Sequence, residues 1–187
     1  MTLWGSTTRI MEREKLNSII ECLLFFSDKP LSIDKLTEII EADNCDEIKG
    51  AVEELEKEYE LRNSGLQVVN IAEGHQICTR SEFSSWVRKL HKSQTTFQLS
   101  LPALETLSII AYKQPATRGE IEKIRGVDAS CVLRTLLEKK LIRISGRKKV
   151  PGRPILYGTT EEFLRYFGLR DLSEIPSLEE IKPPVSS

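Results

Sequence analysis

The chain of 187 residues has few of the side chains that hold metals or carry redox chemistry. A structural zinc site needs four converging ligands, usually at short spacings such as CxxC. The two histidines are isolated, and the two closest cysteines are 23 positions apart; the residues concerned are His75, His91, Cys22, Cys45, Cys78 and Cys131. We therefore predict no metal, no cofactor and no disulfide framework, and we expect reduced cysteines that only fill space.

Long apolar runs are also missing. A membrane-spanning helix needs roughly 20 apolar residues, whereas the best candidate, residues 19–26, is short and contains Glu21. This run has no basic segment before it and no cleavage site after it, so we expect neither a membrane span nor a signal peptide. A cytoplasmic protein follows as the default expectation.

Catalytic motifs are absent as well. The sequence contains no GxxxxGK[ST], GxGxxG, GxSxG or HExxH pattern, which excludes the common nucleotide-binding, hydrolase and zinc-protease signatures. His75 falls at an expected hairpin turn and His91 at the edge of a linker, and neither has a visible partner for acid–base catalysis. We expect both to be surface residues and the protein to lack enzymatic activity.

Charge is present in both signs but is divided along the chain. The formal net charge is −1. Residues 12–60 contain 6 basic and 15 acidic side chains, a net of −9, whereas residues 80–153 contain 16 basic and 6 acidic ones, a net of +10. Such asymmetry indicates two units with different surroundings.

A divergent internal repeat underlies this division. Pro30, Ser32, Leu36 and Ile39 recur 85 positions later as Pro115, Thr117, Ile121 and Ile124. In both halves the pattern predicts a helix, a turn containing proline, and a second helix capped by Ser32 or by Thr117, the latter in a capping box with Glu120. Asn44 and Asp128 are expected to cap a third amphipathic helix in each half.

Each third helix is followed by strand-forming segments. Residues 66–71 and 76–79, around a turn at residues 73–74, predict one β-hairpin, and residues 141–145 and 155–157 predict another around a long Gly/Pro-rich tip. A closing helix follows both hairpins, with Trp86 in the first and with Gly168 as the C-cap of the second.

Three helices and a β-hairpin form a winged helix, so the predicted fold class is α+β, mainly α, with two tandem winged-helix domains. We assign residues 12–91 to the N-terminal domain, 92–98 to a linker and 99–171 to the C-terminal domain. Residues 1–11 and 172–187 are expected to be flexible tails. Domains of this size have marginal cores, and packing against a partner would stabilise both.

Winged helices commonly bind DNA through the third helix. The first copy is unsuited, because its third helix carries seven carboxylates against Lys49 and Lys57 and would repel phosphates. In the second copy, residues 128–132 lack the Arg, Asn and Gln that read base edges. Its wing, residues 146–154, has four cations that would contact phosphates or protein, or serve only solubility. Sequence-specific regulation is therefore not expected.

Protein binding remains. The first helix, residues 16–26, is apolar over more than a single stripe, which fits either the central buried helix of a small domain or a helix that also lines a subunit interface. Trp86 is a second candidate anchor.

Several motifs in the second half resemble segregation and condensation protein B (ScpB). They are residues 99–115 (LSLPALETLSIIAYKQP), 124–128 (IRGVD), 146–154 (GRKKVPGRP) and 156–160 (LYGTT). In the first half, residues 65–69 (GLQVV) and 73–76 (EGHQ) match too. The resemblance spans about residues 12–172, in order.

The resemblance implies a non-catalytic subunit of the bacterial SMC–kleisin condensin, nucleoid-associated, that supports chromosome condensation and segregation during cell division. It implies a homodimer, formed mainly by the N-terminal domain, that binds the kleisin ScpA and reaches the SMC ATPase through ScpA, with DNA contacted only indirectly or weakly. For the dimer we select Ile19, Leu23, Phe26 and Trp86; for the kleisin we select Tyr112, Arg118, Arg125, Arg147, Lys148 and Arg153. The alternative is a winged-helix DNA-binding protein that uses its basic C-terminal domain.

Overall fold

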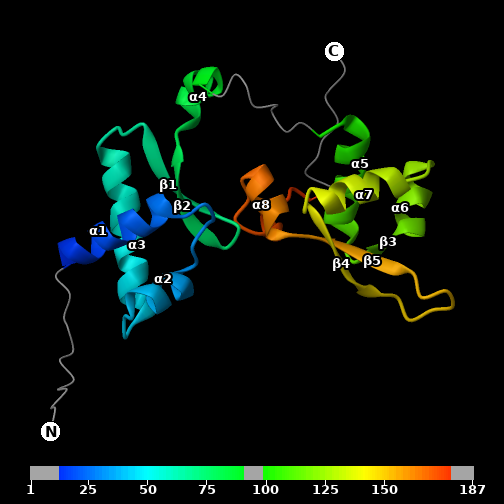
Figure 1. Cartoon of the computed structure of the whole chain (residues 1–187), viewed down its shortest axis with the longest axis horizontal. Coiled ribbons are helices and arrows are strands. Elements are labelled where there is room, and N and C mark those ends of the chain that lie inside the picture. Colours follow the sequence, from blue (N-terminus) through cyan, green and yellow to red (C-terminus); the bar gives the residue numbers. More distant parts are fainter. Residues whose placement is uncertain (1–12, 91–98, 178–187) are drawn as a thin grey trace, which may run out of the picture. The chain divides into compact units, whose positions relative to one another are not determined.

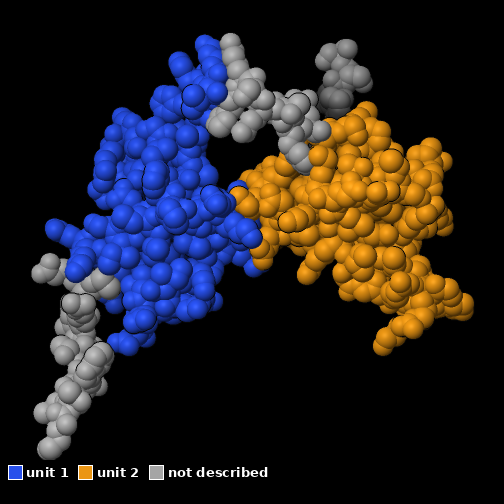
Figure 2. All heavy atoms as spheres, viewed as in Figure 1, with its two compact units in different colours: residues 1–91 blue, residues 92–187 orange. Residues whose placement is uncertain are grey.

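The same order of elements, three helices, a β-hairpin and a closing helix, occurs twice along the chain (Figure 1). The structure is a computed structural model that describes residues 13–90 and 99–177. It divides into two compact units, residues 1–91 and 92–187 (Figure 2). The predicted fold class, α+β and mainly α with two winged helices, is confirmed.

The first unit is built around helix α3 (Cys45–Leu61). It contains α1 (Arg13–Phe26), α2 (Ile33–Ile40), α3, β1 (Leu66–Ile71), β2 (Gly74–Thr79), a 3₁₀ turn (Ser81–Phe83) and α4 (Ser84–Leu90). Helices α1 and α2 pack against α3, and the β1–β2 hairpin covers α3 and the side of α1. Their buried faces form one core: Leu16, Ile20, Leu24, Leu36, Ile48, Ala51, Val52, Leu55, Tyr59 and Val68.

Caps expected from the sequence begin α2 and α3. The Ser32 hydroxyl accepts a hydrogen bond from the Lys35 amide at 3.2 Å, and the Asn44 side chain accepts one from the Asp46 amide at 2.9 Å. The hairpin turn lies one residue earlier than predicted. Ala72 and Glu73 both have positive φ, 49° and 59°, which is the backbone twist that a tight two-residue hairpin turn requires.

The second unit repeats this arrangement. It contains α5 (Leu101–Lys113), β3 (Ala116–Thr117), α6 (Arg118–Arg125), α7 (Ser130–Glu138), β4 (Ile142–Arg147), β5 (Ile155–Thr159), α8 (Glu161–Phe167) and a 3₁₀ turn (Leu172–Glu174). The strands form an antiparallel sheet in the order β3-β5-β4. Helix α5 packs against α6, α7 and β5, around buried Leu107, Ile110, Ile121, Leu133 and Leu136.

Local chemistry again accounts for the helix ends. The capping box of Thr117 and Glu120 is present, and Gly168 ends α8 in the left-handed conformation, as predicted. The expected cap of α7 is displaced by one residue: Ala129 occupies the N-cap position, and Asp128 instead accepts a hydrogen bond from the Ser130 amide at 3.0 Å. A short polar side chain can form such a turn just outside the helix.

A strand that the sequence did not reveal strengthens the repeat. Ala116 pairs with Tyr157 in the second sheet, and Leu31, located 85 positions before Ala116, forms an isolated bridge with His75 in the first unit. Thus in each copy the segment before the second helix adds to the hairpin. Gly74 permits the bridge between Leu31 and His75, because a Cβ at residue 74 would lie 2.9 Å from the Leu31 carbonyl carbon.

The expected flexible segments coincide only partly with the described residues. Tail residues 1–11, linker residues 92–98 and tail residues 178–187 lie outside them, as does His91. The other residues assigned to the C-terminal tail, 172–177, begin with a 3₁₀ turn, and the Pro176 carbonyl accepts a hydrogen bond from the Tyr112 hydroxyl at 2.7 Å. The structure of the second unit therefore extends beyond residue 171.

Candidate protein-interaction surfaces

The exposed side of α1 is apolar at its C-terminal end. Leu16, Ile20 and Leu24 turn into the core, and the opposite side presents Phe25 and Phe26, which are 74% and 88% exposed. Exposed Cys22 and half-buried Ile19 continue this side at helical spacing. We call Ile19, Cys22, Phe25 and Phe26 the α1 patch. Leu23, also selected from the sequence, packs against the core of its own domain.

Helix α4 presents a second apolar surface. It buries none of its residues, with Trp86 63% and Leu90 84% exposed. Figure 1 shows it at the end of the β1–β2 hairpin, away from α1, α2 and α3. The rings of Phe83 and Trp86 lie 6.2 Å apart. We call Phe83, Trp86 and Leu90 the α4 patch.

The repeat shows that this exposure is unusual. The corresponding helix of the second copy, α8, buries Phe163 and Leu164 in its own domain. The contrast is clearest at one equivalent pair, because Phe83 is 38% exposed whereas Phe163 is 4% exposed. Large apolar side chains exposed together are typical of interaction surfaces.

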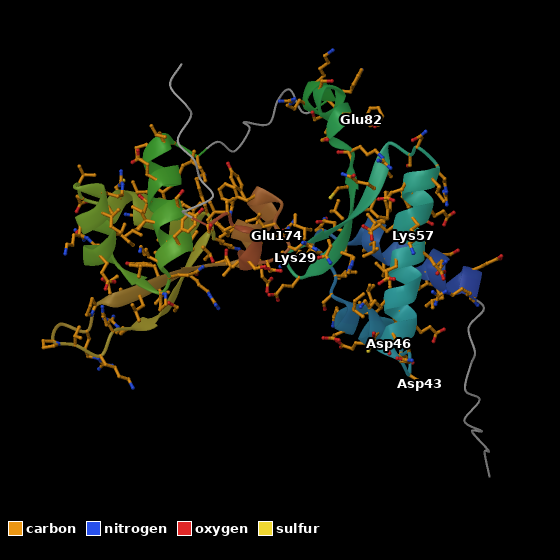
Figure 3. All side chains as sticks on the ribbon, turned by 180° about the vertical axis from the view of Figure 1, so that it is seen from behind. Lys29, Asp43, Asp46, Lys57, Glu82 and Glu174 are labelled. Carbon is orange, nitrogen blue, oxygen red and sulfur yellow. The ribbon has the colours of Figure 1, made fainter. Side chains whose placement is uncertain are left out.

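The acidic face of α3 is solvated, as expected. Its exposed carboxylates include Asp46, shown in Figure 3 near the start of the helix, and Glu54. Glu54 forms a salt bridge with Arg13 at 2.9 Å, which lowers the pKa of the Glu54 carboxyl. Tyr59 donates a hydrogen bond to Glu21 at 2.5 Å, and burial with this bond raises the pKa of Tyr59 to about 12. The contacts of Glu54 and Tyr59 thus stabilise the first domain, and the exposed face of α3 is mainly acidic.

His75 differs from its expected surface position. It lies in β2, where its amide and carbonyl pair with Leu31, and its ring is half-buried. The Nδ1 atom is buried with no hydrogen-bond partner among the described residues. Burial lowers the pKa of His75, although Glu53 opposes the shift. His75 therefore joins the β1–β2 hairpin to the α1–α2 turn through its backbone, which is a structural role.

Metal sites, disulfides and membrane-spanning helices were each sought in the described ranges. Within residues 13–90 and 99–177, no three His, Cys, Asp or Glu side chains are placed to hold a metal ion. The four cysteines are free thiols. In the same ranges, no helix is both long enough and apolar enough to cross a bilayer.

In the second unit, the cations selected on α6 are engaged within the domain. Arg118 forms salt bridges with Glu122 and Asp128, both at 2.6 Å. The Arg125 side chain is only 7% exposed and meets Glu105 of α5 at 3.3 Å. These pairs join α6 to α5 and to the start of α7. Next to them, Ile124 and Val127 are each 56% exposed, so exposed apolar side chains lie beside the cations of α6.

A further salt bridge attaches the wing to α6. Lys148 contacts Glu120 at 2.6 Å, and the ammonium group together with hydrogen bonds from Thr117 lowers the pKa of Glu120 to about 2. One guanidinium nitrogen of Arg147 donates to the Arg153 carbonyl at 3.2 Å. The six residues selected for the kleisin therefore do not form one contiguous basic site. Four of them, Tyr112 included, bond to other parts of the domain.

Comparison with known proteins gives one consistent family. A family model described as segregation and condensation complex subunit ScpB matches residues 18–178. Segregation and condensation protein B of Syntrophotalea carbinolica is 48% identical over 170 residues, which cover 91% of this chain and 85% of the relative. The protein of the same name from Desulforamulus reducens is 47% identical over 171 residues, covering 91% and 93%.

A solved structure is similar to part of the chain. It is the crystal structure of a dimer of ScpB N-terminal domain complexed with ScpA peptide, and it covers 41% of this chain and 95% of that chain at 27% identity. The TM-score is 0.39.

Proposed function

Because this chain belongs to the ScpB family of segregation and condensation complex subunits, we propose that it is a non-catalytic adaptor of the bacterial condensin. In this role it forms a homodimer in the cytoplasm, binds the kleisin ScpA and acts on the SMC ATPase through ScpA, at the nucleoid. The observation that carries the proposal is the family match over residues 18–178, which includes both winged helices. ATP hydrolysis is assigned to SMC.

The dimer contact is assigned to the first domain. A symmetric dimer needs a self-complementary surface, and large aromatic side chains supply most of the binding energy at such contacts. The α1 patch and the α4 patch supply exposed Phe26 and Trp86, together with Ile19 at the edge. Leu23 supports this surface from within the domain, since it packs on the core.

The kleisin contact is assigned to the second domain. A helical or extended segment binds by placing apolar side chains against an apolar surface flanked by polar groups. Ile124 and Val127 provide the exposed apolar surface, and Arg118 and Arg125 hold α6 in place through their ion pairs. Tyr112 lies on the neighbouring α5, where the segment ending at Pro176 contacts its hydroxyl.

The wing residues Arg147, Lys148 and Arg153 were also selected for the kleisin. Lys148 is occupied by Glu120 and Arg147 donates to a wing carbonyl. We therefore place the centre of the kleisin contact on α6, with the wing outside it.

Light scattering during size-exclusion chromatography tests the assignment. The full chain should elute with the mass of a dimer and should shift to a larger complex with a fragment from the middle of ScpA. An Ile124→Asp/Val127→Asp variant should remain a dimer and lose the ScpA fragment. A matched variant, Ile144→Asp, replaces a side chain of equal exposure, 56%, on β4 and should keep the fragment. A monomer that ignores ScpA would overturn the adaptor role.

A further inference from the structure

The wing and its supporting strands carry charge of a single sign. Residues 139–160 contain no Asp or Glu and include the cations Lys139, Lys140, Arg143, Arg147, Lys148, Lys149 and Arg153. The formal net charge of the whole chain is only −1. A surface of one sign attracts ligands of the opposite charge over distances approaching the Debye length, about 8–10 Å at physiological salt.

Hydrogen bonds hold the wing in a defined shape. The Lys148 amide donates to the Pro154 carbonyl at 2.9 Å, and Arg147 reaches the Arg153 carbonyl. Gly152, with φ of 81°, permits the turn at the tip. The salt bridge from Lys148 to Glu120 fixes the wing against the N-terminus of α6. The wing therefore keeps its cations in place before any ligand arrives.

Five exposed cations of this segment have no salt bridge among the described residues, Lys140 and Arg147 among them. Arg143, Lys149 and Arg153 are exposed, and none has a carboxylate partner among the residues that the structure describes. By contrast, Lys148 and the α6 arginines are already paired. An unpaired exposed cation loses little when it meets a phosphate, because no internal ion pair has to be broken.

The geometry points to the phosphate backbone of nucleic acid as the ligand of these cations. Figure 1 shows the β4–β5 wing extending beyond the helices of the second unit as a narrow ribbon. An acidic peptide would need apolar anchoring, and the exposed large apolar side chains of the wing are limited to Ile144 and Val150. A narrow, basic, projecting hairpin is suited to phosphates.

The contact does not read sequence. On α7, the helix that would enter the major groove, the exposed Arg134 is paired with Glu138 at 2.9 Å. Its first turn has Ser130 and Cys131, which lack the bidentate geometry for base edges. Binding through the wing is thus weak and independent of sequence, and it does not depend on the adaptor role.

Fluorescence anisotropy with the full chain and labelled 30-base-pair duplexes of two unrelated sequences tests this inference. Each neutralised phosphate contributes about −0.9 to the slope of log K against log salt, so three contribute about −2.7, or about 40-fold between 50 and 200 mM salt. The triple variant Arg143→Gln/Lys149→Gln/Arg153→Gln should bind both duplexes more weakly, with a slope less steep by about 2.7. Unchanged binding to an ScpA fragment should accompany this loss.

A charge-matched control separates the wing from net charge. The variant Lys29→Gln/Lys49→Gln/Lys57→Gln removes three exposed cations from the first domain; Lys29 and Lys57 are labelled in Figure 3. It should keep the wild-type slope. Equal losses in both triple variants, or no salt-dependent binding by the wild type, would overturn the inference. So would a wing variant that keeps the duplex but loses the ScpA fragment, because the wing would then be a protein-binding surface.

Discussion

Truncation of Phe26 gives the sharpest prediction about the dimer. A phenylalanine side chain buries about 150–250 Å² when fully covered, and Phe26 is 88% exposed in the single chain. If half of the exposed ring is covered in the dimer, its burial contributes about 2 kcal/mol at roughly 25 cal/mol per Å². A symmetric dimer contains this contact twice, so Phe26→Ala should weaken it by about 4 kcal/mol, or about a thousandfold in Kd.

Sedimentation equilibrium over a range of concentrations measures this Kd. The fold of the monomer should be unaffected, because an exposed side chain contributes little to monomer stability, and the far-ultraviolet circular dichroism spectrum should match that of the wild type. Leu61→Ala is the matched control, since Leu61 is 85% exposed at the end of α3, outside both patches, and it should leave the Kd unchanged. A Phe26→Ala protein that dimerises like the wild type would refute the assignment of the α1 patch.

Three further predictions concern stability, measured as the free energy of unfolding in urea. The pKa of His75 is lowered in the folded protein, so the unfolded chain binds this proton more readily. The contribution of His75 to the free energy of unfolding should therefore be fully present above pH 6.5 and decline as the pH falls below it. His75→Gln should reduce that decline, and an unchanged pH dependence would contradict the burial of the ring. Gly74→Ala should destabilise the protein by about 2–3 kcal/mol, because the new Cβ would meet the Leu31 and Pro30 backbone at 2.9 and 3.0 Å. Gly119→Ala in α6 has nothing within 4 Å of its new Cβ and should stabilise by about 0.5–1 kcal/mol. Equal effects of the two variants would count against the close approach at Gly74. Arg125→Ala should lower the free energy of unfolding by about 2 kcal/mol, since the aliphatic stem of this nearly buried side chain packs in the domain. Arg125→Met keeps the stem and should lower it by less than about 1 kcal/mol. Similar losses in both variants would assign the effect to the ion pair with Glu105.

Local signals determined what the sequence could reveal. Hydroxyl and amide caps act within three residues of their targets, so Ser32, Asn44 and the Thr117–Glu120 box could be identified directly. Both winged helices could be predicted because helical spacing and turn residues are local patterns that recur in the same order in the two halves. The two-residue strand β3 was missed because too few residues carry its pattern.

The candidate sites depended on contacts that the sequence does not display. Lys148 meets Glu120 from 28 positions away, and Arg118 meets Asp128 from 10 positions away. Whether a cation is free or paired is decided by such tertiary contacts, so the kleisin set mixed paired and unpaired residues. The same limitation applies to Trp86: its amphipathic helix resembled the packed α8, and only the structure placed α4 away from its own core.

The adaptor role makes binding of the kleisin the central claim. Titration calorimetry of the full chain with a purified fragment from the middle of ScpA measures it most directly. Saturable binding at micromolar or lower concentration, which the Ile124→Asp/Val127→Asp variant loses while it remains a dimer, is the result we predict. No detectable binding by the wild-type dimer, confirmed by the absence of a shifted complex in size-exclusion chromatography, would contradict the account.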